Sequence, residues 1–63
     1  MNANLKVARI KMGYNQKQLA EKVGVSSKYI SRLESTETLP SPDVMKRIAS
    51  ALNCSVQELF FEK

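Results

Sequence analysis

Residues 16–34 read QKQLAEKVGVSSKYISRLE, and this stretch decides the fold of the 63-residue chain. Leu19, Ala20 and Val23 fall on one face of a first helical segment, and Ile30 and Leu33 mark one face of the next. The stretch therefore predicts two short helices that follow one another closely.

The residues between the two segments favour a tight turn. Gly24 can adopt the left-handed conformation that ends a helix, and Ser26 can accept a hydrogen bond from a free N–H group that opens the next one. Two helices that cross steeply after so short a turn need a small residue at the crossing, and we expect Ala20 to fill that place.

This pattern resembles the helix-turn-helix of the lambda-repressor/Cro family, also called the Xre family, of bacterial and phage regulators. The residues that carry the resemblance are Leu19, Ala20, Val23, Gly24, Val25, Ile30, Leu33 and Glu34. It extends over nearly the whole chain and implies an all-α, compact five-helix domain over residues 1–63, with its helix-turn-helix at about 16–35. It also implies a sequence-specific regulator of transcription that binds double-stranded DNA, acting as a repressor.

Composition agrees with one small domain. There is no low-complexity run and no apolar stretch near the ~18 residues of a membrane span, so we expect a cytoplasmic protein. The chain has no histidine and one cysteine, Cys54, which we expect to be a buried core thiol. No metal, cofactor or small-molecule ligand is predicted. An enzyme is not expected either, since the partners of nucleophilic, metal or phosphoryl chemistry are missing.

The positive charge is concentrated in the half of the chain that carries the helix-turn-helix. Residues 1–32 hold seven Lys or Arg and one Glu, whereas residues 33–63 hold three Lys or Arg and five acidic residues. Such asymmetry indicates a polyanionic partner for the N-terminal half. The alternative is that these are ordinary solvated side chains.

The first helix is expected to end at Gly13 and to present an apolar face made of Leu5, Ala8, Ile10 and Met12. Tyr14 is expected to pack over the core beside the following turn. The family resemblance implies that Arg9 pairs with Glu34, and the alternative is an exposed arginine.

The second helix is expected from about Asn15 or Gln16 to Val23. Its free N–H groups and positive dipole end suit a phosphate oxygen, and an Asn or Gln side chain can add to the site. The resemblance places Gln16 at the DNA backbone. Asn15 is either a phosphate contact or a helix cap, and the two roles can coexist.

The third helix, about Ser27 to Ser35, is the candidate recognition helix. Turning its apolar residues inward leaves an outer row at i, i+4 spacing, made of Ser27, Lys28, Ser31 and Arg32. An α-helix fits the major groove, where Lys and Arg suit the O6/N7 edge of guanine and Ser can exchange one hydrogen bond. We therefore expect base contacts from this row. Lys28 and Arg32 alternatively touch phosphate only, and Tyr29 flanks the row within reach of a phosphate.

The loop at residues 35–42 departs from the family pattern. Thr36 stands where glycine is usual and cannot easily adopt a left-handed turn, and Glu37 stands where a basic residue is usual. The loop is therefore a poor phosphate clamp. The amino end of the fourth helix, capped by Ser41 with Pro42 at its first position, is expected to contact phosphate instead.

The fourth helix is expected to end near Asn53, with a core face made of Val44, Met45, Ile48, Ala49 and Leu52. Residues 55–58, Ser-Val-Gln-Glu, read as a capping box that opens a fifth helix. Phe60 and Phe61 are adjacent, so they cannot both enter one core.

The segment 55–63 is the candidate contact of a homodimer, through Val56, Leu59, Phe60 and Phe61. One recognition helix reads few base pairs, so pairing on an inverted-repeat operator adds specificity. The alternative is that both rings complete the monomer core. A second functional class also stays open, namely a protein-binding module such as an antitoxin-like domain.

Overall fold

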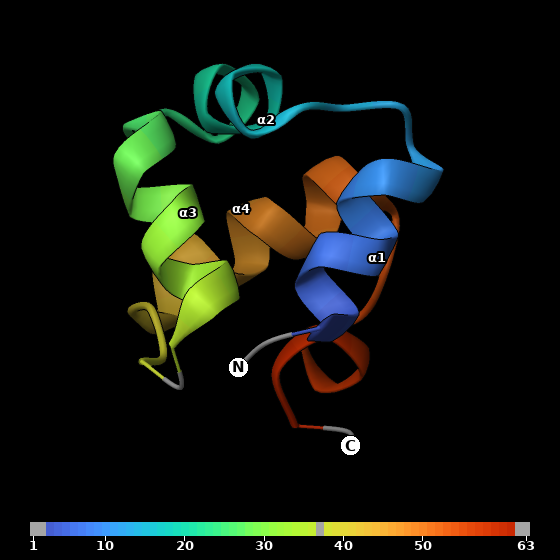
Figure 1. Ribbon diagram of the computed structural model, residues 1–63. Coiled ribbons are helices and arrows are strands. Elements are labelled where there is room, and N and C mark those ends of the chain that lie inside the picture. Colours follow the sequence, from blue (N-terminus) through green and yellow to red (C-terminus); the bar gives the residue numbers. More distant parts are fainter. Residues whose placement is uncertain (1–2, 37, 62–63) are drawn as a thin grey trace.

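The computed structural model describes residues 3–36 and 38–61, and in them it contains helices but no strand. The helices are α1 (Ala3–Lys11), α2 (Gln16–Val23), α3 (Ser27–Ser35), α4 (Pro42–Leu52) and η1 (Gln57–Phe61), the last being one π-helical turn. In Figure 1, α1 and α3 lie on opposite sides, α2 crosses above them, and η1 packs below α1. The all-α, five-helix prediction is confirmed.

Local hydrogen bonds explain where the helices begin and end. The Asn15 side chain accepts from the Gln18 N–H at 2.7 Å, and the Gln18 side chain accepts from the Asn15 N–H at 2.8 Å, which closes a capping box. Ser26 caps α3 by accepting from the Tyr29 N–H, and Ser41 caps α4 by accepting from the Val44 N–H. Gly24 ends α2 at a φ of 89°. The predicted tight turn between α2 and α3 is confirmed.

Every helix contributes to one core. The largest fully buried side chains are Leu5, Leu19, Ile30, Leu33, Ile48, Leu52 and Leu59. Val44, Tyr14 and Cys54 are partly buried against this cluster. Because each short helix buries its apolar face only against the others, the domain folds as one unit.

The predicted core face of α1 is wrong for two residues. The Ile10 and Met12 side chains are 56% and 44% exposed. Arg9 is buried instead, because it lies one turn from Leu5 at i, i+4 spacing, whereas Ile10 at i+5 points to the other flank. Met12 directly follows Lys11, the last residue of α1, and its N–H still donates to the Ala8 carbonyl oxygen at 3.1 Å, so its side chain lies at the very end of the helix, just before the turn at Gly13.

The fifth helix begins as predicted. The Ser55 hydroxyl accepts from the Glu58 N–H at 3.1 Å, and the Glu58 carboxylate accepts from the Ser55 N–H at 3.2 Å. Phe60 packs partly against the core, whereas Phe61 is 59% exposed. One of the two adjacent rings is therefore left in water, as their spacing predicts.

Ala20→Leu should destabilise the domain by about 1–3 kcal/mol, because Ala20 is buried on a helix that packs against α3 and α4, and added carbon atoms in a packed core must displace their neighbours. Glu21→Leu is the matched control, since Glu21 is the exposed neighbour on the same helix and its change should stay within about 0.5 kcal/mol. Urea unfolding of both variants measures this difference. Equal stabilities would contradict the close crossing.

Candidate nucleic-acid interface

The outer side of α3 carries the row that the sequence predicts for base contact. Ser27, Lys28 and Arg32 are exposed and Ser31 is half-buried, while Ile30 and Leu33 on the opposite side are fully buried. The apolar side thus fixes the rotation of α3 about its axis. The four polar residues remain free to meet a partner.

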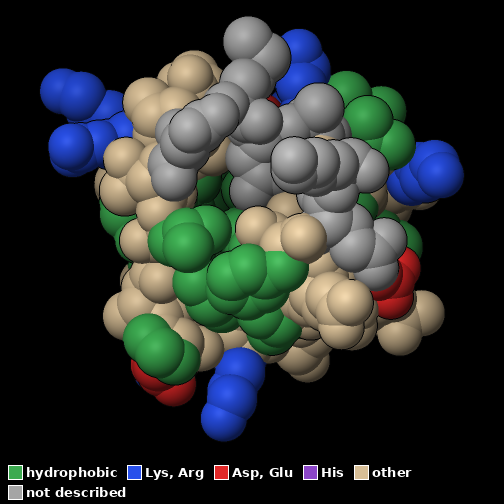
Figure 2. All heavy atoms as spheres, turned by 90° about the horizontal axis from the view of Figure 1, so that it is seen from below, with side chains coloured by type: hydrophobic (Ala, Val, Ile, Leu, Met, Phe, Trp, Pro, Cys, Tyr) green, Lys and Arg blue, Asp and Glu red, His purple; other side chains and the backbone are tan. Residues whose placement is uncertain are grey.

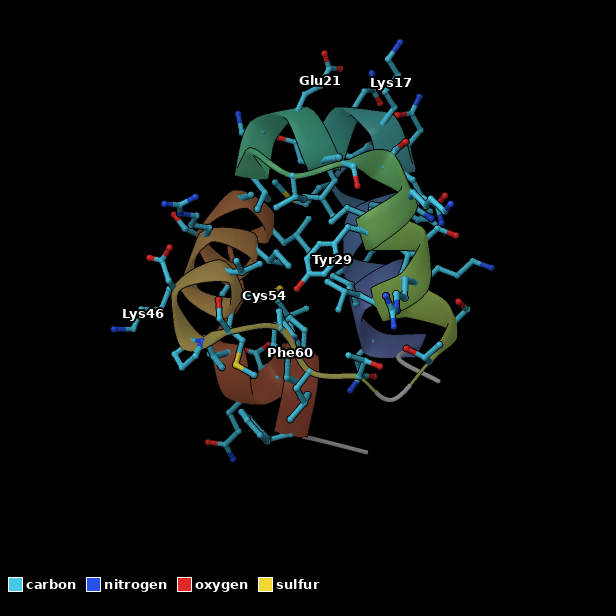
Figure 3. All side chains as sticks on the ribbon, turned by 90° about the vertical axis from the view of Figure 1, so that its left-hand side faces the viewer. Lys17, Glu21, Tyr29, Lys46, Cys54 and Phe60 are labelled. Carbon is cyan, nitrogen blue, oxygen red and sulfur yellow. The ribbon has the colours of Figure 1, made fainter. Side chains whose placement is uncertain are left out.

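An open hollow runs along the same side of α3. Its lining residues are Ser26, Lys28, Tyr29, Ser31, Arg32 and Ser35. The Tyr29 ring is directed from α3 toward α4 in Figure 3 and is partly buried against the core. Tyr29 therefore supports one border of the hollow, beside the Lys28 and Arg32 cations.

The amino end of α2 lies beside α3. The oxygen of the Asn15 side chain is used by the cap of α2, so the cap role weighed in the sequence is realised. Lys17 lies in the first turn of α2 and is exposed, and Figure 3 shows this side chain pointing away from the protein above α3. Backbone N–H groups and a cation thus meet at one helix end, an arrangement that suits a phosphate oxygen.

Arg9 and Glu34 lie in contact between α1 and α3. The Arg9 Nε and Nη2 atoms donate to Glu34 Oε2 at 2.6 Å and Oε1 at 3.2 Å, a two-point pairing. The Arg9 Nη1 atom also donates to the Tyr14 carbonyl oxygen at 2.8 Å. The two side chains are only 10% and 5% exposed, so both charges are shielded from water and depend on these partners.

Gln16 joins this buried pair, which the sequence did not predict. Its Nε2 atom donates to Glu34 Oε1 at 3.1 Å, and the Gln16 side chain is partly buried. The contact spans 18 residues, so no local spacing pattern points to it. The residue that the resemblance places at the DNA backbone is thus held by α3.

The loop after α3 takes a conformation that follows from Thr36. Thr36 ends α3 with φ at −128°, an extended conformation in place of the left-handed turn of a glycine. The exposed Ser41 side chain caps α4 by accepting from the Val44 N–H at 3.4 Å. The expected repulsion of phosphate by Glu37 concerns a residue outside the described ones.

The residues considered for a dimer contact are not equally available. Leu59 is only 2% exposed and belongs to the monomer core, because η1 turns it toward α1. Val56 and Phe60 are partly buried, which leaves Phe61 as the exposed ring. Figure 2, viewed from the η1 end of the protein, shows hydrophobic side chains gathered on this face. Residues 62–63 of this segment lie outside the described ones.

Other kinds of site find no support in the described residues. No group of three or more Cys, Asp or Glu side chains there could hold a metal ion. None of the helices in residues 3–36 and 38–61 has the length and apolar character needed to cross a membrane.

Comparison with known proteins defines the class. A family model described as Helix-turn-helix matches residues 5–59, which is most of the chain. The chain therefore belongs to this helix-turn-helix family, as the resemblance to lambda-repressor/Cro regulators predicts.

The matching proteins are transcriptional regulators, not enzymes. The chain is 37% identical to the HTH-type transcriptional regulator SinR of Bacillus subtilis over 94% of its own length and 54% of SinR. It is 38% identical to the competence pilus inhibition repressor of Acinetobacter baylyi, over 82% of this chain and 47% of that one. The chain thus spans about half the length of these relatives.

A solved structure supports the fold. The solution structure of the N-terminal DNA-binding domain of SinR, the master biofilm regulator of Bacillus subtilis, matches all of this chain and 93% of that one. The TM-score is 0.84 at 34% sequence identity.

Arg9→Met should destabilise the domain by about 3–5 kcal/mol, because it leaves the Glu34 carboxylate buried without its cation. Arg47→Met is the matched control, since Arg47 pairs with Asp43 at 3.1 Å on the exposed side of α4. That loss should stay within about 1 kcal/mol. Urea unfolding measures the loss of stability in both variants. Similar losses would show that the buried Arg9–Glu34 pair contributes no more to stability than the exposed Arg47–Asp43 pair.

Proposed function

We propose that this chain is a cytoplasmic, sequence-specific DNA-binding domain that represses transcription, with α3 lying in the major groove. The observation that carries the proposal is the exposed row Ser27, Lys28, Ser31 and Arg32 on the second helix of a helix-turn-helix. Two of these side chains are cations suited to guanine, and the two serines can donate or accept one hydrogen bond each.

Phosphate contacts are proposed around this row. The amino end of α2 offers Asn15, Gln16 and the exposed Lys17, and the capped start of α4 offers Ser41. Tyr29 borders the hollow on α3 and is proposed to meet a phosphate with its hydroxyl group. Such contacts set the register of a helix in the groove, while base contacts supply the specificity.

Repression is proposed because of the relatives. One of them is named a competence pilus inhibition repressor, and SinR is named a transcriptional regulator. The excess of Lys and Arg in residues 1–32 further supports a polyanionic partner.

A homodimer on an inverted-repeat operator completes the proposal. Phe61 is the proposed anchor because it is the exposed ring of η1, with the partly buried Val56 and Phe60 beside it. Leu59 contributes by holding η1 on the core. Two-fold pairing would set the recognition helices about 34–36 Å apart, one turn of DNA.

A labelled duplex selected from a random pool tests the proposed function directly. Binding should be specific against unlabelled competitor and should weaken steeply as the salt concentration rises, because cations replace counterions on phosphate. A protein-binding module of this fold would not bind the duplex in this specific, salt-dependent way.

Lys28→Ala and Arg32→Ala should each lose about 1–3 kcal/mol of discrimination at one base position of the selected duplex. The measurement is a titration of each variant against every single-base change of the operator. Lys46→Ala is the matched control, since Lys46 is an exposed lysine on α4, pointing away from α3 in Figure 3. A uniform loss on all sequences would contradict base contact.

Phe61→Glu should shift the protein from dimer toward monomer, because it places a charge at the proposed apolar contact. Sedimentation at micromolar concentration measures the shift, together with binding to whole and half operators. Leu39→Glu is the control, since Leu39 is another exposed apolar residue, on the loop before α4. A monomeric wild type that binds a half operator as tightly as a whole one excludes the dimer.

A further inference from the structure

The side-chain amide of Gln16 is held in one orientation. Its partner at 3.1 Å is a carboxylate oxygen of Glu34, which can only accept hydrogen bonds while ionised. The –NH2 group of the amide must therefore face Glu34. The amide plane cannot be reversed without placing two acceptor oxygens against each other.

This orientation leaves one donor free. An amide –NH2 group carries two N–H bonds, and Glu34 uses one of them. The Gln16 Nε2 atom makes no second hydrogen bond to any of the described residues. Gln16 is the first residue of α2, so its remaining N–H bond lies at the same helix end as the free backbone N–H groups.

The Glu34 carboxylate, which holds the Gln16 amide, is itself fixed by hydrogen bonds. Two nitrogen atoms of Arg9 bind Glu34, and a third is tied to the Tyr14 carbonyl oxygen. Glu34 also lies on the side of α3 that borders the outer row, because residues 27, 31 and 34 follow i, i+4, i+7 spacing. Gln16 thus connects the buried Arg9–Glu34 ion pair to the edge of the proposed DNA-binding surface.

We infer that Glu34 is a positioning residue for phosphate binding: it fixes the Gln16 amide so that the second N–H bond is directed to a DNA phosphate oxygen. This inference rests on the proposed function. It gives the ion pair a role besides stability, since a donor that is already oriented loses less side-chain entropy when the phosphate arrives.

A double-mutant cycle tests the inference. The four proteins are wild type, Gln16→Ala, Glu34→Asp and the double variant, titrated with a random-sequence duplex at a temperature where all are folded. Glu34→Asp keeps the charge beside Arg9 but withdraws the carboxylate from Gln16 by one methylene group. Each single change should weaken binding about tenfold, as the loss of one hydrogen bond to a charged group does. The double variant should bind no more weakly than either. If the affinity of the double variant instead falls by the product of the two single losses, the two changes act independently and the inference is overturned.

The salt dependence separates positioning from general loosening. Gln16 is neutral and releases no counterion, so all four proteins should show the same slope of log K against log salt concentration. If Glu34→Asp merely loosened the helices, the nearby Lys17 and Lys28 contacts would be lost and the slope would fall. Glu21→Asp is the matched control on the exposed side of α2 and should bind as the wild type does.

A measurement without DNA keeps the inference separate from the proposed function. In the wild type, the 15N relaxation of the Gln16 side-chain amide should show a rigid group, whereas the exposed Gln57 amide on η1 should be mobile. Equal mobility of the two amides overturns the inference even if DNA binds. If the Gln16 amide is rigid but the protein binds no duplex, the proposed function is overturned instead.

Discussion

The Arg9–Glu34 ion pair is the constraint on which the rest of this structure depends. It joins α1 to α3 across 25 residues of sequence. Taking two charges out of water costs several kcal/mol for each ion, and only a complete set of hydrogen bonds offsets that cost. The set is complete here, since the Tyr14 carbonyl oxygen and the Gln16 amide supply the partners that the pair itself lacks. No buried side-chain nitrogen or oxygen in the described residues is left without a hydrogen bond.

The same constraint organises both sides of α3. Its inner side carries Ile30 and Leu33, which fix the helix to the core, and Glu34 at the edge of that side binds Arg9 of α1. Its outer side carries the exposed polar row. Because a helix is nearly rigid over nine residues, holding the inner side in one orientation also sets where Lys28 and Arg32 point. Stability and recognition are therefore properties of a single helix.

A domain of 63 residues has little apolar surface to bury. Each helix contributes a leucine or isoleucine to the common core, and α1 also buries the charged side chain of Arg9. This arrangement leaves Val7, Ile10 and Phe61 exposed. A small core has only a few inward-facing positions, so some apolar residues on short helices remain in contact with water.

The sequence by itself determined the helices and their ends. The cap pairs of Asn15 with Gln18 and of Ser55 with Glu58 act over three residues, and Gly24 acts on its own backbone, so local reading suffices. The tertiary structure alone decided that Ile10 faces water, that Leu59 lies in the core, and that Gln16 binds Glu34. Helical spacing shows which residues share a face, but not which flank of that face meets a neighbour. That choice depends on contacts between segments far apart in the chain, and those exist only once all the helices have packed.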